Sequence, residues 1–262
     1  MKEALRDHDI EEFNTLKDRF DDAKWDKELD YLLIEDFQTS GLNGNHKVMS
    51  KAEYDSSGNK LETNNRFQKF HWDWGGHDDD EAGNTGGSWG YGKAALTLAS
   101  KIKTIISLST RNVIEKDDST LEQTLFGLCL ISPHRDISMS PPVEHRMYGY
   151  YTTDIVGDIL PLSVTEPTDS FLEDFKKEIG INRKIAKEER GLSILIPWPK
   201  DVISPISIIR SIVKNYSYAI QKELLEVIVT SSDGKEYPIK KEHLVEYIKE
   251  EKFEWEEVGV EP

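Results

Sequence analysis

Four glycines fall within the seven residues from 86 to 92, and a lysine and a helix-forming run at 94–100 follow directly. Glycine lets the backbone approach a ligand closely and adopt a positive φ. The first turn of a helix presents free N–H groups and the positive end of the helix dipole. The stretch therefore predicts a phosphate-holding loop, formed by Gly86, Gly87, Gly90, Gly92 and Lys93. The alternative is a flexible surface loop in front of a core helix.

The same residues come close to a P-loop without completing it. Positions 87–94 read G-x-x-x-x-G-K-A, so Ala94 stands where a P-loop has the Ser or Thr that binds magnesium. A P-loop also follows a buried strand, whereas the residues at 77–85 are acidic and polar. A P-loop NTPase is therefore kept only as an alternative.

A pair of carboxylates marks a second candidate site. The apolar run 29–34 predicts a short strand, which ends in Glu35 and Asp36 and leads into a turn containing Gly41 and Gly44. This pattern places a carboxylate pair at the C-terminal end of a buried strand. Taken alone, Asp36 could equally be a turn or cap residue, because Asp side chains commonly bond to nearby backbone in turns.

Histidines and acidic residues gather in the polar stretch that follows, at His71, His77 and 78–80 (Asp78 to Asp80). Imidazole and carboxylate groups both ligate metals, but this spacing matches no recognised metal motif, and a solvated acidic loop is the alternative. Three aromatic residues nearby alternate with polar ones, which predicts a half-buried strand. They are Phe70, Trp72 and Trp74.

Length and charge bound the class of protein. The 262 residues, 37% of them hydrophobic, suffice for one main core or for a domain with a smaller lobe. A formal net charge of −16 disfavours broad contact with nucleic acid or anionic lipid. The single cysteine, Cys129, cannot form an internal disulfide and lies in an apolar run, as a small core residue would. We see no membrane-spanning run and no signal peptide, and we expect a cytoplasmic protein.

Hydrophobic periodicity predicts the elements that must position these residues. Helical spacing occurs at 3–24, 170–179 and 203–223. β-prone runs occur at 102–111, 124–132 and 190–197, and the first two of these should pair as antiparallel neighbours. The remaining expectations are a loop with an edge strand at 133–163, a hairpin of 225–230 with 236–239, and a charged, partly helical tail from residue 242.

A long polar stretch, 45–85, connects the carboxylate turn to the glycine loop. It is poor in apolar residues apart from the aromatic island at 67–74. Connections of this length within compact domains are commonly functional. We therefore expect a mobile lid with one anchored patch.

The order of these features resembles the GHKL ATPases, a family named for DNA gyrase B, heat-shock chaperones, histidine kinases and MutL. The shared order is a strand with Asp36 and a glycine turn, a long polar lid, the glycine loop and helix, antiparallel strands, and the string GLSILIP at 191–197. The resemblance covers residues 29–200. It implies the Bergerat fold, an α/β (α+β) two-layer sandwich with helices on one face of a mixed sheet. It also implies an ATP-binding domain at 1–200, extended by the helix, hairpin and tail at 201–262.

The resemblance implies a role for each candidate residue. Asp36 would accept a hydrogen bond from the adenine amino group, and Gly41 would shape the adenine pocket. A buried carboxylate satisfied in this way discriminates adenine from guanine. The amides of Gly86, Gly87, Gly90 and Gly92 would hold the phosphates, Lys93 would reach them as a point charge, and the lid 45–85 would close over the nucleotide.

The sequence departs from the family pattern at three places. Gln38 stands where the first glycine motif normally has glycine. In the later G-T-x-I motif, Leu192 takes the threonine position, so Ser193 becomes the candidate hydroxyl beside the adenine. At the N-terminus, Glu3 and Asp7 offer E-x-x-x-D as water-activating base and magnesium ligand, with too little β-prone sequence after them to supply the family's next strand.

Two functions therefore stay open beside the weaker P-loop alternative. The first is an ATP-binding, GHKL-type module that uses ATP and Mg as a nucleotide-dependent conformational switch, with weak or absent ATPase activity unless the catalytic helix is supplied from upstream of Met1. The second is a nucleotide-independent interaction scaffold. The motif strings also resemble a bacterial subgroup found beside mobile-element and defence genes. That resemblance implies other protein subunits or a further N-terminal portion as partners, with a homodimer among the options and nucleic acid contacted only indirectly.

Overall fold

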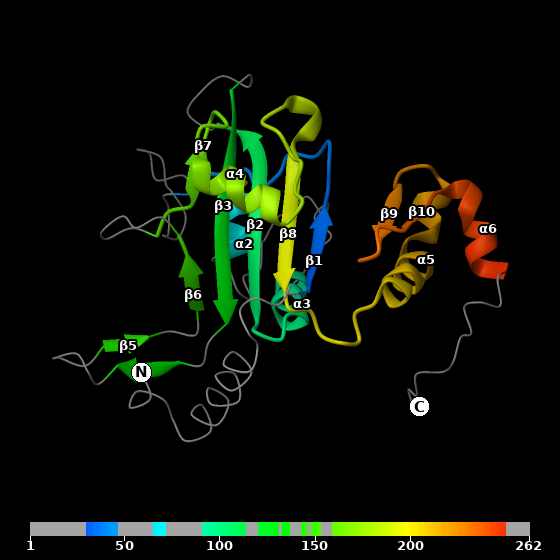
Figure 1. Cartoon of the computed structure of the whole chain (residues 1–262), viewed down its shortest axis with the longest axis horizontal. Coiled ribbons are helices and arrows are strands. Elements are labelled where there is room, and N and C mark those ends of the chain that lie inside the picture. The colour runs from blue at the N-terminus through cyan, green and yellow to red at the C-terminus, as the bar shows by residue number, and fades with distance from the viewer. Residues whose placement is uncertain are drawn as a thin grey trace, which may run out of the picture. The chain divides into compact units, whose positions relative to one another are not determined.

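The computed structural model describes residues 30–46, 65–71, 91–113, 120–130, 133–136, 143–145, 148–152 and 159–249. The chain divides into two compact units, Met1–Pro199 and Lys200–Pro262 (Figure 1). The predicted helix at 3–24 lies outside the described residues.

A six-stranded sheet forms the centre of the first unit (Figure 1). Its strands in spatial order are β1 (Tyr31–Glu35), β8 (Gly191–Pro197), β2 (Thr104–Asn112), β3 (Leu121–Leu130) and β6 (Tyr148–Tyr151), and β7 (Leu162–Val164) also pairs with β3. All of these pairs are antiparallel. Two further strands, β4 (His134–Asp136) and β5 (Val143–His145), form a separate antiparallel pair.

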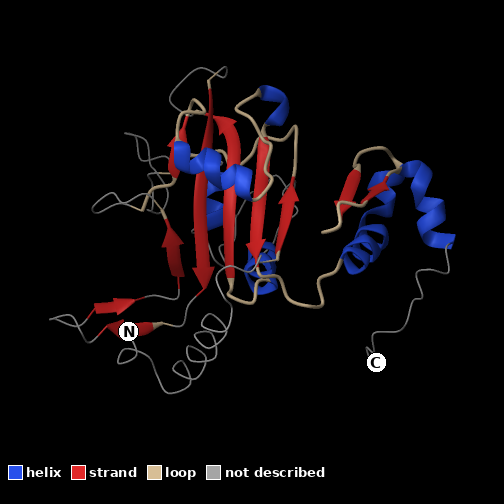
Figure 2. Cartoon of the chain, viewed as in Figure 1, coloured by secondary structure: helices blue, strands red, loops and turns tan. Residues whose placement is uncertain are grey.

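Both faces of the sheet are covered by helices. On one face, Ile105 of β2 packs in a cluster with side chains of α2 (Arg66–His71) and α3 (Tyr91–Ala99). On the other face, Leu108 packs against α4 (Ser170–Glu178). Figure 2 shows α4 on the near side of the sheet and α2 on the far side. Because residues of a strand alternate between the two faces, β2 and β3 are buried on both sides, and they bury polar residues such as Ser107 and Gln123 as well as apolar ones.

The predicted α+β class is confirmed by this mixture of helices with a sheet. Two details differ from the expectation. The described strands pair antiparallel rather than in a mixed sheet. The amphipathic helix α4 lies on the face opposite α2 and α3, because Leu172 and Phe175 of α4 need an apolar surface and find it over β2 and β3.

Most predicted elements of the first unit are confirmed. The run 29–34 forms β1, but β1 lies at the edge of the sheet and has no buried residue, so the expectation of a buried strand before Asp36 is wrong. The two β-prone runs at 102–111 and 124–132 form the antiparallel pair β2 and β3, and 190–197 forms β8 between β1 and β2. The stretch 133–163 holds more regular structure than the single predicted edge strand, since β4, β5, β6 and β7 fall within or at its end. Cys129 is half-buried in β3, where burial raises the pKa of its thiol.

The predicted half-buried strand at 70–74 is wrong where it can be compared. Phe70 lies in α2, a helix that begins after Asn65, whose side-chain oxygen accepts the Gln68 N–H at 2.9 Å as a cap. Phe67 and His71 are four residues apart and therefore bury on the same helix face. The alternation of aromatic and polar residues was too short to separate a strand from one helical turn. Trp72 and Trp74 lie outside the described residues.

The second unit has its own small core. Helix α5 (Pro205–Gln221) begins with a capping box between Ser204 and Ser207 and packs against the hairpin of β9 (Val227–Thr230) and β10 (Glu236–Ile239) and against α6 (Lys241–Lys249). The predicted helix, hairpin and helical tail are thus confirmed. The buried apolar residues that hold them together are Ile209, Val213, Ile220, Val229, Ile239 and Leu244. Of the helices in the described ranges, α5 included, none has the length and apolar character needed to cross a membrane.

Candidate functional site

The carboxylate of Asp36 is held at the junction of β1 and β8. Its Oδ1 accepts a hydrogen bond from the Leu192 N–H at 2.8 Å and another from the Thr39 hydroxyl, also at 2.8 Å. The side chain is exposed rather than buried. Among the described residues, none donates to the second oxygen, Oδ2. One oxygen is therefore fixed by the protein, while the other is left available as an acceptor.

Thr39 supplies the hydroxyl beside Asp36. Besides donating to Asp36, its Oγ1 accepts the Gly41 N–H at 3.3 Å, so it links the carboxylate to the turn that follows. The sequence alone assigned this residue no role. The spacing D-x-x-T is a signal that could have indicated one, because Asp and Thr side chains commonly form short-range hydrogen bonds within turns.

Gly41 occupies a position that only glycine fits. Its φ is +63°, and a Cβ there would lie 2.6 Å from Ser109 Oγ and 2.8 Å from the Thr110 carbonyl oxygen. The next residue is tied to the same strand, since the Leu42 N–H donates to Ser109 Oγ at 2.8 Å. The turn after Asp36 is thus pressed against the end of β2.

Gln38 lies in the turn after Asp36, at the position where the sequence departs from the pattern it resembles. Gln38 has a φ of 59°, which is the left-handed conformation that glycine adopts most easily. A side chain in this conformation carries a small backbone cost.

A buried arginine fixes the far half of the turn. Arg111 is fully buried, and its Nη1 donates to the carbonyl oxygens of Leu42 and Gly44, both at 2.7 Å. Glu122 pairs with the same guanidinium at 2.9 Å. Burial lowers the pKa of Arg111, and the attraction of Glu122 opposes that shift. Because two backbone carbonyls share one rigid donor group, the turn cannot move away from β2 without exposing this ion pair.

Helix α2 anchors the predicted lid to the same turn. The Phe67 N–H donates to the Asn43 carbonyl, and the Asn65 side-chain amide donates to the Asn45 carbonyl, both at 2.8 Å. Phe67 and His71 are fully buried, and His71 Nε2 lies 3.2 Å from Ser107 Oγ. This is the expected anchored patch in the stretch 45–85.

His71 is therefore a core residue in this structure, and its ring lies 4.6 Å from the ring of Phe126. The described part of the chain contains no group of three or more His, Cys, Asp or Glu residues arranged to hold a metal. His77 and Asp78 to Asp80 lie outside the described residues, as do Glu3 and Asp7.

The glycine loop is described only where its helix begins. Gly92 and Lys93 fall in the first turn of α3, while Gly86, Gly87 and Gly90 lie outside the described residues. Gly92 is exposed, and a Cβ there would meet no atom within 4 Å. At the other end of the helix, Ser100 Oγ donates to the Pro197 carbonyl at 2.6 Å. The C-terminal end of α3 thus meets the end of β8 that is opposite to Asp36.

Ser193 has a role within the protein. It is 1% exposed, its hydroxyl donates to Glu35 Oε1 at 2.6 Å, and its oxygen accepts from Arg183 Nε at 2.8 Å. Its single hydroxyl proton is therefore committed to Glu35. In the register of β8 with β1, Ser193 lies opposite Glu35 and one residue away from Leu192, the partner of Asp36.

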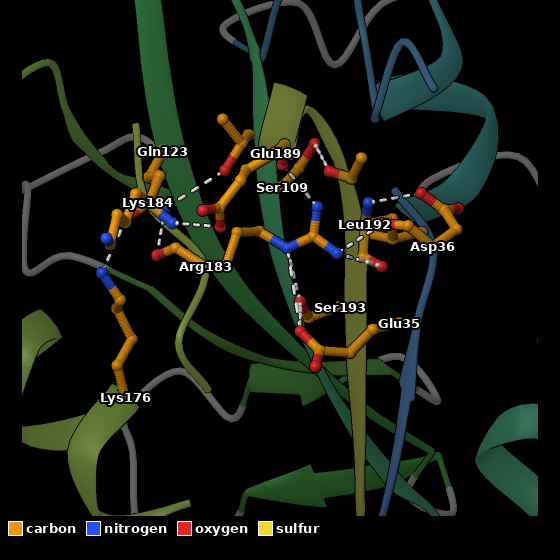
Figure 3. Close-up of polar contacts among 12 residues, drawn as sticks. Glu35, Asp36, Ser109, Gln123, Lys176, Arg183, Lys184, Glu189, Leu192 and Ser193 are labelled. Carbon is orange, nitrogen blue, oxygen red and sulfur yellow. Dashed lines mark hydrogen bonds and ion pairs between the residues drawn. The ribbon is translucent and has the colours of Figure 1, made fainter. Parts of the chain in front are cut away.

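Arg183 lies at the centre of a polar network that sequence analysis did not predict (Figure 3). It is 1% exposed, donates to the backbone oxygens of Asp36, Glu189 and Leu192, and lies with its guanidinium carbon 4.3 Å from the ring centroid of Phe37. Burial lowers its pKa, and the nearby carboxylates, led by that of Glu35, oppose this shift. Nothing in the local sequence around Arg183 signals a buried cation, because its partners come from distant strands.

The network continues beneath α4. Gln123 donates to the Arg183 carbonyl at 3.1 Å and accepts from the buried Lys176 Nζ at 3.4 Å, and Lys176 also pairs with Glu173 at 2.9 Å. These side chains extend the polar layer from the Asp36 junction to the helix on that face (Figure 3).

Comparison of the chain with protein-family models, with curated proteins and with solved structures finds no match. The resemblance to the GHKL family therefore depends on the motif order in the sequence. The geometry around Asp36 defines an exposed, backbone-fixed carboxylate beside a tight glycine turn at one end of an antiparallel sheet.

Proposed function

We propose that this chain is an ATP-binding module of the GHKL type, in which Asp36 recognises the adenine base. The observation that carries this proposal is the asymmetry of the Asp36 carboxylate. Within the described residues, both hydrogen bonds to this exposed side chain go to Oδ1, from Leu192 and Thr39, which leaves Oδ2 available as an acceptor. An available acceptor on a fixed carboxylate suits the exocyclic amino group of adenine, which is a donor.

The same arrangement supports selection against guanine. Guanine carries an oxygen at the corresponding position, so two acceptors would face each other without a shared proton. The turn at Gly41 would bring backbone close to the base, and the amides of the glycine stretch that ends at Gly92 would hold the phosphates.

Nucleotide binding would serve as a conformational switch with little hydrolysis. Hydrolysis needs a water-activating base and a magnesium ligand, for which Glu3 and Asp7 are the candidates. We expect turnover of ATP with Mg to be slow and unchanged by E3Q and D7N. A large loss of turnover in either variant would instead make this chain a complete ATPase.

Calorimetry with ATP and Mg tests the base contact through D36N. In this variant the amide oxygen can keep the two bonds to Leu192 and Thr39, which places the amide –NH₂ where Oδ2 was. A donor would then face the adenine amino group, so ATP affinity should fall by about tenfold or more. Relative affinity for GTP should rise, because guanine presents an acceptor there.

The matched control is D174N, which makes the same chemical change on the exposed face of α4. D174N should bind ATP as the wild type does. If the wild type binds no nucleotide, or if D36N and D174N bind ATP equally well, the ATP proposal is wrong and the nucleotide-independent scaffold is the remaining function. Whether the chain is an ATP-binding module or a scaffold, its partners would be other protein subunits.

The P-loop alternative receives no support from the fold. A P-loop lies between a strand and a helix in a βαβ unit, whose strands are parallel. The sheet in the described residues is antiparallel, and its β2 and β3 pair directly.

A further inference from the structure

The pairing of β1 with β8 becomes irregular at Asp36. Asp36 donates its N–H to the Leu192 carbonyl at 2.9 Å. At the other end of the strand pair, the Trp198 N–H donates to the Asp30 carbonyl, also at 2.9 Å. In an antiparallel ladder such residues normally exchange both N–H···O bonds. The regular partner of the Leu192 N–H would thus be the Asp36 carbonyl, but this N–H donates to the carboxylate Oδ1 instead.

Arg183 donates to the Asp36 carbonyl oxygen, which has no partner in the ladder. Its Nη2 donates to the Asp36 carbonyl oxygen and, at 3.3 Å, to the Leu192 carbonyl oxygen. One –NH₂ group therefore bridges both strands at this point. Because the Asp36 carbonyl is satisfied by a charged donor, the Leu192 N–H is released to hold the side chain.

The surroundings of Arg183 hold its guanidinium on several sides. Arg183 is fully buried and is held from the remaining sides by Ser193, the Glu189 carbonyl and the ring of Phe37. The neighbouring residue must be glycine, because a Cβ at Gly191 would lie 2.3 Å from the Asp36 carbonyl oxygen and 2.4 Å from Oδ1. The guanidinium and the absent Cβ together define where the carboxylate sits.

We propose that Arg183 is a positioning residue for base recognition. It donates a hydrogen bond to the Asp36 carbonyl oxygen, so that the Leu192 N–H is available to bind the Asp36 carboxylate. The inference rests on the proposed function for its consequence in binding. Its structural core, an exchange of hydrogen-bond partners at Leu192, is independent of any nucleotide.

The test combines R183K and R183Q with D36N. Lysine keeps the charge, but its single ammonium lacks the planar fork that serves three backbone carbonyls and Ser193 at once. We expect both variants to lose ATP affinity by about tenfold, with the preference for ATP over GTP falling toward unity. Because Arg183 acts through Asp36, the double variant R183K/D36N should bind no more weakly than D36N alone.

The control is R210K, which makes the same chemical change at a half-buried arginine of α5 in the second unit. R210K should leave ATP affinity within about twofold, because changes at distant sites without shared partners act independently. Wild-type affinity and selectivity in R183K, or losses in R183K and D36N that add in the double variant, would overturn the proposal.

A crystal structure of R183K separates this inference from the proposed function. The Leu192 N–H should return to the Asp36 carbonyl, with the carboxylate turned away. Persistence of the bond from Leu192 N–H to Oδ1 would overturn the positioning role, whether or not ATP binds. If the exchange occurs but the wild type binds no nucleotide, only the proposed function fails.

Discussion

At the scale of single residues, Asp36 combines two demands that normally conflict. A ligand-binding carboxylate must be exposed, yet it must also be fixed, and an exposed side chain loses rotamer freedom only at a cost in entropy. Leu192 and Thr39 resolve this conflict by holding one oxygen and leaving the other open. Preorganised acceptors of this kind bind without paying again for ordering.

Replacing Thr39 with valine tests the hydroxyl contribution. T39V removes the donor to Asp36 Oδ1 and the acceptor for the Gly41 N–H while keeping the side-chain volume. A hydrogen bond to a charged group contributes about 1.5–3 kcal/mol, so we expect ATP affinity measured by calorimetry to fall by about tenfold. The matched control is T165V at an exposed threonine. Equal binding by T39V and T165V would show that Thr39 does not hold the carboxylate.

Two glycines should respond in opposite ways to alanine. G191A introduces a Cβ 2.3 Å from the Asp36 carbonyl oxygen at a φ of +149°, so the free energy of unfolding should fall by about 1–3 kcal/mol or more. G92A meets no atom within 4 Å and lies in α3, where alanine stabilises a helix by about 0.5–1 kcal/mol relative to glycine. Urea denaturation measures both. A neutral G191A would contradict the close approach of β8 to Asp36.

At the scale of elements, Arg111 joins the turn after Asp36 to β2 and β3. The guanidinium satisfies two carbonyls of the turn and one carboxylate of β3 within a buried site. This contact holds the start of the stretch 45–85, and α2 holds its middle. Residues 42–46 and helix α2 are thereby fixed to the sheet.

The R111M and R111M/E122L variants separate the ion pair from the turn. R111M leaves Glu122 buried without its partner, which should lower the free energy of unfolding by about 3–5 kcal/mol. Replacing both charges by apolar residues should recover much of that loss. ATP affinity should remain weak in the double variant, because the carbonyls of Leu42 and Gly44 still lack their donor. Recovery of both stability and affinity would mean that the turn needs no anchor.

At the scale of the whole molecule, the chain has separate apolar cores in its two units. The cluster around Ile209 lies in Lys200–Pro262, and the clusters around Ile105 and Leu108 lie in Met1–Pro199. Units with their own cores can unfold separately. The proposed nucleotide site involves only the first unit.

The variant I209A tests this separation. Ile209 is 1% exposed, and its truncation should destabilise the second unit by about 2–5 kcal/mol. Hydrogen exchange followed by mass spectrometry should show faster exchange in α5, β9 and β10, with β2 and β3 unchanged. ATP affinity should equal that of the wild type. Faster exchange in the central sheet would contradict the division into separately cooperative units.

The sequence by itself determined the local elements and one end of the candidate site. Periodicity located β1, β8 and α5 because side-chain alternation and helical spacing are local properties. The strand end at Asp36 and the glycine turn could also be predicted, since the backbone preferences of turn residues depend on the residue type itself. The short aromatic stretch around Phe70 failed because one turn of helix has too few residues to define a period.

Only the tertiary structure decided what surrounds Asp36. The bond from the Leu192 N–H spans 156 positions in the chain, and the bond from Arg183 spans 147. Such contacts depend on which strands become neighbours, and that choice is made by burial of the whole sheet rather than by residues near either partner. Buried arginines are rare and occur only when their partners surround them. Arg183 and Arg111 could therefore be recognised only after β1, β8, β2 and β3 had been brought together.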